Sequence, residues 1–213
     1  MPERKKTIVY IDGFNLYYRA LKGTPYKWLD LDAFCRKLLP KNDVIGIKYF
    51  TALVSARPND PQQPIRQETY LRALRTLPNL DIIEGAFLSN AVCLPRVLDR
   101  KSRTLGEPVW VYRTEEKGSD VNLATHLLTD ACRGAFEAAV LVSNDTDFLL
   151  PITMVREVMG QPVGVVYPSE RISERLRAAA SFIKPVRTSA LRDCQFPVTL
   201  RDDVGTITKP AGW

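Results

Sequence analysis

The chain has 213 residues, of which 45% are hydrophobic and 25% charged, so its composition excludes a disordered chain and its length favours one domain with additions over two. Its 30 lysine and arginine residues exceed its 24 acidic residues, and the net charge of +6 suits a polyanionic partner without identifying one. No apolar run approaches the roughly 20 residues that cross a bilayer, and the charged amino terminus is unlike a signal peptide, so we expect a cytoplasmic protein with no membrane partner.

The first half of the chain alternates between strand and helix patterns. Short apolar runs rich in β-branched residues predict strands, and apolar residues repeated every three or four positions predict helices. Prolines mark where segments end, since Pro40 stops the second helix and the proline-rich stretch 57–64 is typical of a loop. The expected elements are strand 7–12, helix 13–22, helix 30–39, strand 44–54, helix 65–77 and strand 80–87.

The second half continues the alternation. Residues 138–143 are almost wholly apolar, as in strands buried on both faces of a parallel sheet. Helix 120–132 is expected to be capped by Ser119 or Asp120. Pro151 lies in the first turn of another expected helix, 148–159, where proline is tolerated. The expected elements are strand 109–113, helix 120–132, strand 138–143, helix 148–159, strand 163–167 and helix 170–180.

This alternation predicts a three-layer α/β/α fold with a mainly parallel central sheet over residues 1–187. Residues 88–108 interrupt it, and we interpret them as a basic loop, or a short ribbon, inserted between core elements. Residues 188–213 contain Pro197 and Pro210 and are too short for a separate domain. We expect them to form a tail that packs on the domain.

The number and spacing of the cysteine and histidine residues argue against chemistry at these side chains. The chain has four cysteines, far apart and without a CxxC pair, and His126 is its single histidine. These residues exclude a Cys/His zinc site, a disulfide framework and a catalytic triad with a supported histidine. Any chemistry would therefore depend on carboxylates.

Acidic residues gather where the predicted strands end. Asp12 ends the first strand, and Asn15 lies one turn into the following helix. Asp145 and Asp147 follow the most apolar strand, and Asp120 opens a helix after another. Because ligands bind at the carboxyl ends of strands in open parallel sheets, the four acids are expected to converge on one edge. Oxygen ligands favour a hard cation, Mg²⁺ or Mn²⁺, over zinc.

Each acid also has a purely structural explanation. Asp12, Asp120 and Asp147 are each well placed to cap a helix. Asp145 is harder to explain in this way, because a cap does not require two acids that bracket one residue. Like charges brought together repel unless a cation or a proton intervenes. A metal site and a set of helix caps therefore stay open as alternatives.

Three segments resemble the signature blocks of NYN domains, which are PIN-like nucleases with a Rossmann-like fold. They are IVYIDGFNLYY (8–18), EKGSDVNLATHLL (116–128) and VLVSNDTDF (140–148), in the family's order. The resemblance covers about residues 6–187 and is greatest to the bacterial LabA-like branch. It departs in Ser119, where a hydrophobic residue is more usual, and in Asn144-Asp145-Thr146, where Gly-Asp-Ser is commoner. Neither departure removes an acid.

The resemblance implies metal-dependent, endonucleolytic hydrolysis of RNA phosphodiester bonds. Asp12, Asp120 and Asp145 would be the principal metal-site carboxylates, and Asp147 would complete the cluster directly or through water. Asn15 would orient the substrate or a metal-bound water. The implied cofactor is Mg²⁺ or Mn²⁺ and the implied partner is RNA, with DNA as a substrate and a homodimer left open.

Weaker candidates surround this proposed centre. Ser143 would contact a metal-bound water or a phosphate, and Lys117 would contact the scissile phosphate. Segment 94–108 is the preferred RNA-contact region. Its basic residues are Arg96, Arg100, Lys101 and Arg103. Aromatic residues that could stack on unpaired bases are Tyr17, Tyr18, Tyr26 and Trp28, although Tyr17 or Tyr18 is expected to be buried.

Two other functions stay open. The same fold could serve as an RNA-binding regulatory module with little catalysis, which RNA binding without cleavage would indicate. Acids at strand ends also serve metal-dependent phosphohydrolases that act on small phosphate esters. Asp12 is followed by Gly13 and Phe14, however, and so lacks the second acid two residues on that covalent aspartyl catalysis uses.

Overall fold

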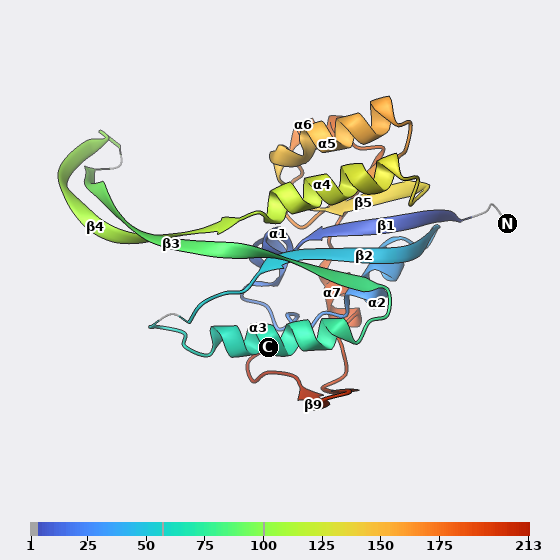
Figure 1. Cartoon of the computed structure of the whole chain (residues 1–213), viewed down its shortest axis with the longest axis horizontal. Helices are drawn as coiled ribbons and strands as arrows, with labels where there is room; N and C mark the ends of the chain where they lie inside the picture. Colours follow the sequence, from blue (N-terminus) through green and yellow to red (C-terminus); the bar gives the residue numbers. More distant parts are fainter. Residues whose placement is uncertain (1–3, 57, 100) are drawn as a thin grey trace.

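The computed structural model describes residues 4–56, 58–99 and 101–213 and contains a seven-stranded sheet in the order β4-β3-β2-β1-β5-β6-β7 (Figure 1). Within these residues, neighbouring strands of the sheet are parallel except β3 and β4, which are antiparallel. The strands are β1 (Lys5–Asp12), β2 (Asn42–Ala52), β3 (Leu80–Asp99), β4 (Thr104–Lys117), β5 (Ala138–Val142), β6 (Val163–Tyr167) and β7 (Phe182–Pro185).

Helices cover both faces of the sheet. One face packs against α2 (Leu31–Leu38), α3 (Gln63–Arg75) and α7 (Thr188–Asp193), and the other against α4 (Ser119–Cys132), α5 (Leu149–Thr153) and α6 (Glu174–Ala179). Three short helical segments complete the set. They are α1 (Gly13–Leu16) with the π-helical turn Tyr17–Leu21, the 3-10 turn Thr146–Phe148 before α5, and the π-helical turn Met154–Val158 after it. This mixed α/β architecture confirms the predicted fold class. No helix in the described part of the chain is long and apolar enough to span a bilayer.

Central strand β1 explains why the core strands are apolar without alternation. Val9 and Ile11 belong to the hydrophobic core on the α2–α3 side, whereas Ile8 and Tyr10 belong to the core on the α4–α5 side. Both faces are therefore buried, and each fully buried aliphatic side chain contributes roughly 1.5–3 kcal/mol. The parallel neighbour β5 is buried along its whole length for the same reason.

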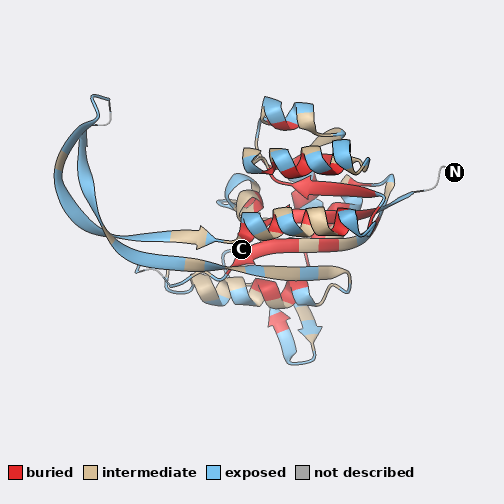
Figure 2. Cartoon of the chain, turned by 45° about the horizontal axis from the view of Figure 1, so that its top comes forward, coloured by how far each residue is buried: buried red, intermediate tan, exposed pale blue. Residues whose placement is uncertain are grey.

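Strands β3 and β4 continue beyond the sheet as a long two-stranded ribbon. They pair from Ala86–Lys117 to Asp99–Thr104, and the ribbon extends away from the helices with almost all of its residues exposed (Figure 2). At about 3.3 Å per residue, β4 alone reaches over about 40 Å. The loop predicted over 88–108 is therefore wrong, and the alternative, a ribbon, is what the structure contains. Neither face of the ribbon is covered, so its side chains lack the alternation that marks a half-buried strand.

Helix boundaries correct two predicted caps. The cap position of α4 is Gly118, whose φ of 99° lies in the left-handed region that glycine favours, and not Ser119 or Asp120. Ser119 begins the helix, and its backbone N–H and hydroxyl both donate to Glu116 Oε1, at 3.0 and 2.7 Å. At the next acidic site, Asp145 rather than Asp147 caps the helical turn, because Asp145 Oδ1 accepts the Asp147 N–H at 3.0 Å.

The carboxyl-terminal segment contains a small hairpin, β8 (Thr199–Asp202) and β9 (Gly205–Thr208), besides α7. Arg72 on α3 binds Asp202 through two hydrogen bonds of 2.7 and 2.9 Å. Ile207 is buried in the core on the same side. The segment thus packs against α3 through one ion pair and apolar contacts.

Candidate metal centre and the pocket beside it

Asp12 lies at the carboxyl end of β1, between β2 and β5, and is 6% exposed. Its Oδ1 accepts the Asn15 N–H at 2.9 Å, and its Oδ2 accepts the Ser143 hydroxyl at 2.9 Å. Burial raises the pKa of Asp12 to about 6; the two hydrogen bonds oppose this shift, and the charges of Asp120 and Asp145 add to it. The carboxylate is therefore held in one orientation at an energetic cost.

The loop after β5 is tied to the same point. Asp145 N–H donates to Ser143 Oγ at 3.1 Å, and Asn144 N–H donates to Asn15 Oδ1 at 3.1 Å. Ser143 is fully buried, so its hydroxyl joins Asp12 to the backbone of Asp145. Ser143 and Asn15 thus position the loop that carries Asp145.

Asp120 reaches this edge of the sheet from the first turn of α4. A Cβ at Gly85 would lie 2.6 Å from Glu116 Oε1 and 3.0 Å from Ser119 Oγ, so the absence of a side chain lets β3 approach the start of α4. The pKa of Asp120 is raised by burial and then by the charges of Asp145, Glu116 and Asp147.

Asp120, Asp145 and Asp147 form what we call the acidic cluster. One carboxylate oxygen of each lies within 4.8 Å of the others. These donors are all oxygens, and the pKa of Asp120 is raised by burial and then by the charges of its acidic neighbours. Both properties fit a divalent cation of the Mg²⁺ or Mn²⁺ type. Asp12 is not one of these three, but after burial the charges of Asp120 and Asp145 contribute to its raised pKa.

Glu116 is a neighbour that the sequence reasoning missed. It raises the pKa of Asp120, yet its Oε1 is occupied by Ser119. Its place in the segment EKGSD, four residues before Asp120, was the available signal.

The predicted basic contact residues are on or next to β3 and β4. Lys117 Nζ pairs with Glu115 at 2.7 Å. The predicted RNA-contact residues Arg96, Lys101 and Arg103 are exposed on the distal half of the ribbon, where contact with RNA stays a prediction. Arg100 lies outside the described residues.

The predicted stacking residues differ in how far they are exposed. Trp28 is fully buried, and its Nε1–H donates to Pro197 O at 2.8 Å, so its prediction as a stacking residue is wrong. Tyr18 is 48% exposed, and Tyr17 is half-buried.

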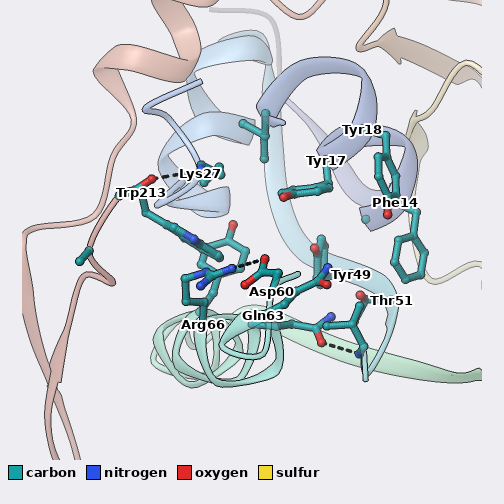
Figure 3. Close-up of a pocket in the computed structure, with 17 residues that line it drawn as sticks. Phe14, Tyr17, Tyr18, Lys27, Tyr49, Thr51, Asp60, Gln63, Arg66 and Trp213 are labelled. Carbon is teal, nitrogen blue, oxygen red and sulfur yellow. Dashed lines mark hydrogen bonds and ion pairs between the residues drawn. The ribbon is translucent and has the colours of Figure 1, made fainter. Parts of the chain in front are cut away.

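A pocket with a volume of about 280 Å³ (Figure 3) is lined by Gly13, the residue after Asp12. We call it the aromatic pocket. Its aromatic lining residues are Phe14, Tyr17, Tyr18, Tyr49, Tyr70 and Trp213, and its charged ones are Lys27, Asp60 and Arg66. A Cβ at Gly13 would lie 2.7 Å from the Tyr49 ring and 2.6 Å from Phe50 O, so only glycine lets this part of the chain pack against Tyr49. Sequence reasoning named two of the tyrosines but did not identify a pocket.

A family model for the NYN domain matches residues 6–189. The chain belongs to the NYN-domain family. This NYN-domain protein is 34% identical, over an alignment of 243 residues, to 6-hydroxy-3-succinoylpyridine 3-monooxygenase HspA of Pseudomonas putida; the match covers 99% of this chain and 76% of that protein.

One solved structure with a similar fold is a protein of unknown function from Vibrio parahaemolyticus. It aligns with a TM-score of 0.58 and 18% identity and covers 88% of this NYN-domain chain and 96% of its own. At this identity the likeness concerns the fold alone. The family membership confirms the resemblance seen in the three sequence blocks.

Proposed function

We propose that this NYN-domain protein is a divalent-metal-dependent ribonuclease that hydrolyses RNA phosphodiester bonds endonucleolytically. The acidic cluster carries the proposal, since three carboxylates within 4.8 Å of one another form an arrangement that a cation stabilises. Membership of a family of PIN-like nucleases supports it.

Asp120, Asp145 and Asp147 would hold Mg²⁺ or Mn²⁺, and Asp12 would join them directly or through water. A bound divalent ion supplies the positive charge that polarises a phosphate oxygen and stabilises the negative charge that builds up during hydrolysis. Ser143 and Asn15 act as positioning residues, because their side chains link Asp12 to the loop that carries Asp145. This role differs from the direct phosphate or water contact that the resemblance implies for them.

The surrounding charge favours a polyanionic substrate. Setting aside the four site aspartates leaves 24 − 4 = 20 acidic residues against 30 basic ones. An acidic site within a basic surface attracts the phosphate backbone to its rim. A divalent ion held by the aspartates would offset their repulsion of the scissile phosphate.

Cleavage of a single-stranded RNA in Mg²⁺ or Mn²⁺ tests the proposal. Asp145→Asn should lose cleavage and keep the wild-type circular dichroism spectrum and Tm to within a few degrees. Asp43→Asn is the matched control, because Asp43 is exposed at the amino-terminal, opposite end of β2. If Asp145→Asn cut RNA as fast as wild type, the proposal would be wrong.

Two other outcomes identify other functions. Tight RNA binding by wild type without cleavage in either metal would indicate a regulatory module. Hydrolysis of p-nitrophenyl phosphate without RNA cleavage would indicate a phosphohydrolase.

A second candidate function is turnover of a small aromatic acid. The name of the Pseudomonas putida relative describes a monooxygenase of a succinoylpyridine, and the aromatic pocket beside Asp12 is of a size for one such molecule. Consumption of 6-hydroxy-3-succinoylpyridine in the presence of dioxygen and a two-electron reductant, followed by absorbance, would support it. No consumption under these conditions would count against it.

A further inference from the structure

The aromatic pocket lies next to Asp12 of the proposed metal centre. Gly13 and Phe14 line it and directly follow Asp12 in the chain. Two Cα–Cα steps separate Asp12 from Phe14, which is at most about 7.6 Å. Tyr49 lines the pocket as well, and the charge of Asp12 contributes to its raised pKa. A ligand in the pocket would therefore lie close to Asp12.

Aromatic rings form most of the wall. Phe14 and Tyr18 stack with ring centroids 6.4 Å apart, and Tyr17 meets Tyr18 edge-on at 5.2 Å. Trp213 packs against Tyr70 at 5.7 Å on another side. Rings offer a planar ligand large contact areas at low entropic cost. A volume of about 280 Å³ suits one ring system with a short substituent and excludes a duplex or a folded peptide.

The polar groups of the pocket carry excess positive charge. Lys27 and Arg66 line it, and Figure 3 shows both beside the Trp213 side of the cavity. Of its described lining residues, Asp60 is the acidic one, and its carboxylate accepts a hydrogen bond of 2.5 Å from Arg66 Nη2. Burial lowers the pKa of Lys27, and the charges of Arg66 and Lys209 lower it further. An anion would relieve this repulsion.

We infer that the aromatic pocket binds a planar aromatic ring that carries an anionic group, with the ring among the tyrosines and the anion at Arg66 and Lys27. The inference deepens the proposed function, on which it rests for one source of this ligand, the base and phosphate of an unpaired nucleotide next to the scissile bond. A free aromatic acid has the same recognisable chemistry. Arg66 is then a binding residue, and Asp60 competes with the ligand for it.

Calorimetric titration of the full chain in EDTA tests this inference, since EDTA removes metal that would hold phosphate at the acidic cluster. The probes are AMP, adenosine and benzoate. AMP should bind about tenfold more tightly than adenosine, because an ion pair adds to ring contacts. Tighter binding of AMP than of benzoate identifies a nucleotide site, and the reverse order identifies a free aromatic acid; both support the inference.

Two neighbouring substitutions should act in opposite directions. Arg66→Gln should weaken AMP about tenfold, whereas Asp60→Asn should tighten it about threefold by freeing the guanidinium. Neither should change adenosine binding. Tyr18→Ala, at an exposed ring, should weaken AMP and adenosine alike.

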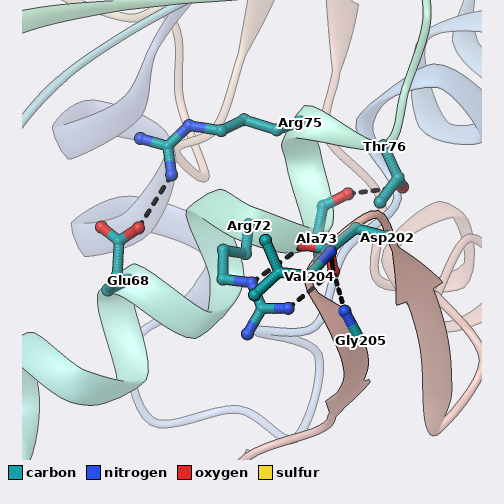
Figure 4. A network of polar contacts seen from close by, with 8 residues as sticks. All are labelled: Glu68, Arg72, Ala73, Arg75, Thr76, Asp202, Val204 and Gly205. Atoms are coloured by element: carbon teal, nitrogen blue, oxygen red, sulfur yellow. Dashed lines mark hydrogen bonds and ion pairs between the residues drawn. The ribbon is translucent and has the colours of Figure 1, made fainter.

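Arg75→Gln is the matched control on the same helix. Arg75 pairs with Glu68 (Figure 4) and with Glu84, and it does not line the aromatic pocket. This variant should leave all three affinities unchanged. A measured Tm for each variant verifies that it is folded.

Two results would overturn the inference: neither AMP nor benzoate binds, or Arg66→Gln and Asp60→Asn change AMP affinity in the same direction. The second result would mean that the two residues form only a structural pair. If RNA is not cut but AMP binds in an Arg66-dependent manner, the proposed function fails and the pocket stands. If RNA is cut, the probes do not bind and Arg66→Gln leaves KM unchanged, the pocket fails alone.

Discussion

Two aspartates in this molecule, Asp12 and Asp202, have opposite electrostatic surroundings. At the carboxyl end of β1, Asp12 is buried beside Asp120 and Asp145, and its pKa is raised to about 6. On the far side of α3, Asp202 accepts hydrogen bonds from Arg72 and from the Val204 and Gly205 N–H groups (Figure 4). Those bonds lower the pKa of Asp202 to about 2.

The difference separates a candidate binding site from a structural contact. Asp202 has its counter-charge within the fold, so its ionised form stabilises the native state. Asp12 and Asp120 are instead desolvated by burial and lie near other carboxylates, so their ionised forms destabilise the native state, and a bound cation would offset this cost. A strongly raised pKa caused by burial and like charges is typical of functional sites.

The largest expected effect concerns catalysis. Asp120→Asn should reduce metal-dependent RNA cleavage by at least about 100-fold, because loss of even an outer-shell partner costs 10–100-fold in typical metal sites. Asp202→Asn should leave the cleavage rate unchanged. Initial rates on a single-stranded RNA in Mn²⁺ measure both. Equal losses in the two variants would show that the two regions do not differ in function.

The next effect concerns stability and pH. Because the folded pKa of Asp12 is raised from 3.8 to about 6, the folded state binds the proton more tightly than the unfolded state. Stability should therefore fall as pH rises from about 4 to about 6, with a penalty of up to about 3 kcal/mol above pH 6.

Asp12→Asn cannot ionise and should flatten this slope. Urea unfolding of both proteins in EDTA at several pH values between 4 and 7.5 measures it. The free energy of unfolding of the variant, minus that of wild type, should be larger at pH 7.5 than at pH 4. The same slope in both proteins would contradict the assignment of the penalty to Asp12.

A smaller effect is expected from the metal itself. A ligand at ten times its Kd stabilises the native state by about 1.4 kcal/mol, so Mg²⁺ or Mn²⁺ should raise the Tm of wild type at pH 7. Asp145→Asn should lose most of this increase, and Asp43→Asn should keep it. An equal increase in all three would mean that the ion binds elsewhere.

The sequence predicted those parts of the molecule that depend on local pattern and burial. Strands β1 and β5 are buried on both faces, so their sequences are continuous apolar runs. These runs predicted the strands and, with them, the acidic residues at their carboxyl ends. The parallel sheet then brings Asp12 and Asp145 to one edge. Asp120 joins them because Gly118 is the cap position of α4 at that edge, and no periodicity in the sequence reveals its left-handed φ.

The parts that were missed depend on tertiary contacts or on exposure. Along the β3–β4 ribbon, exposed Trp110 and Tyr112 on one face and Val109 and Val111 on the other leave no apolar alternation to detect. The aromatic pocket joins Phe14 to Trp213 across almost the whole chain. The residues that line such a site are too far apart in the sequence to form a recognisable motif.

The smallest expected effect concerns the structural pair. Asp202 has a lowered pKa, so its contribution to stability is present above pH about 4 and is lost as pH falls towards 2. Asp202→Asn keeps an oxygen for the Val204 and Gly205 N–H groups but loses the charge that faces Arg72. The variant should therefore show a small drop in Tm at pH 6 and a smaller one at pH 2, whereas exposed Asp81→Asn should show neither. Because the pair is partly exposed, 0.5 M NaCl should shrink the drop at pH 6. A drop of equal size at pH 2 would mean that the contact depends on shape rather than charge, and the contrast with Asp12 would lose its electrostatic basis.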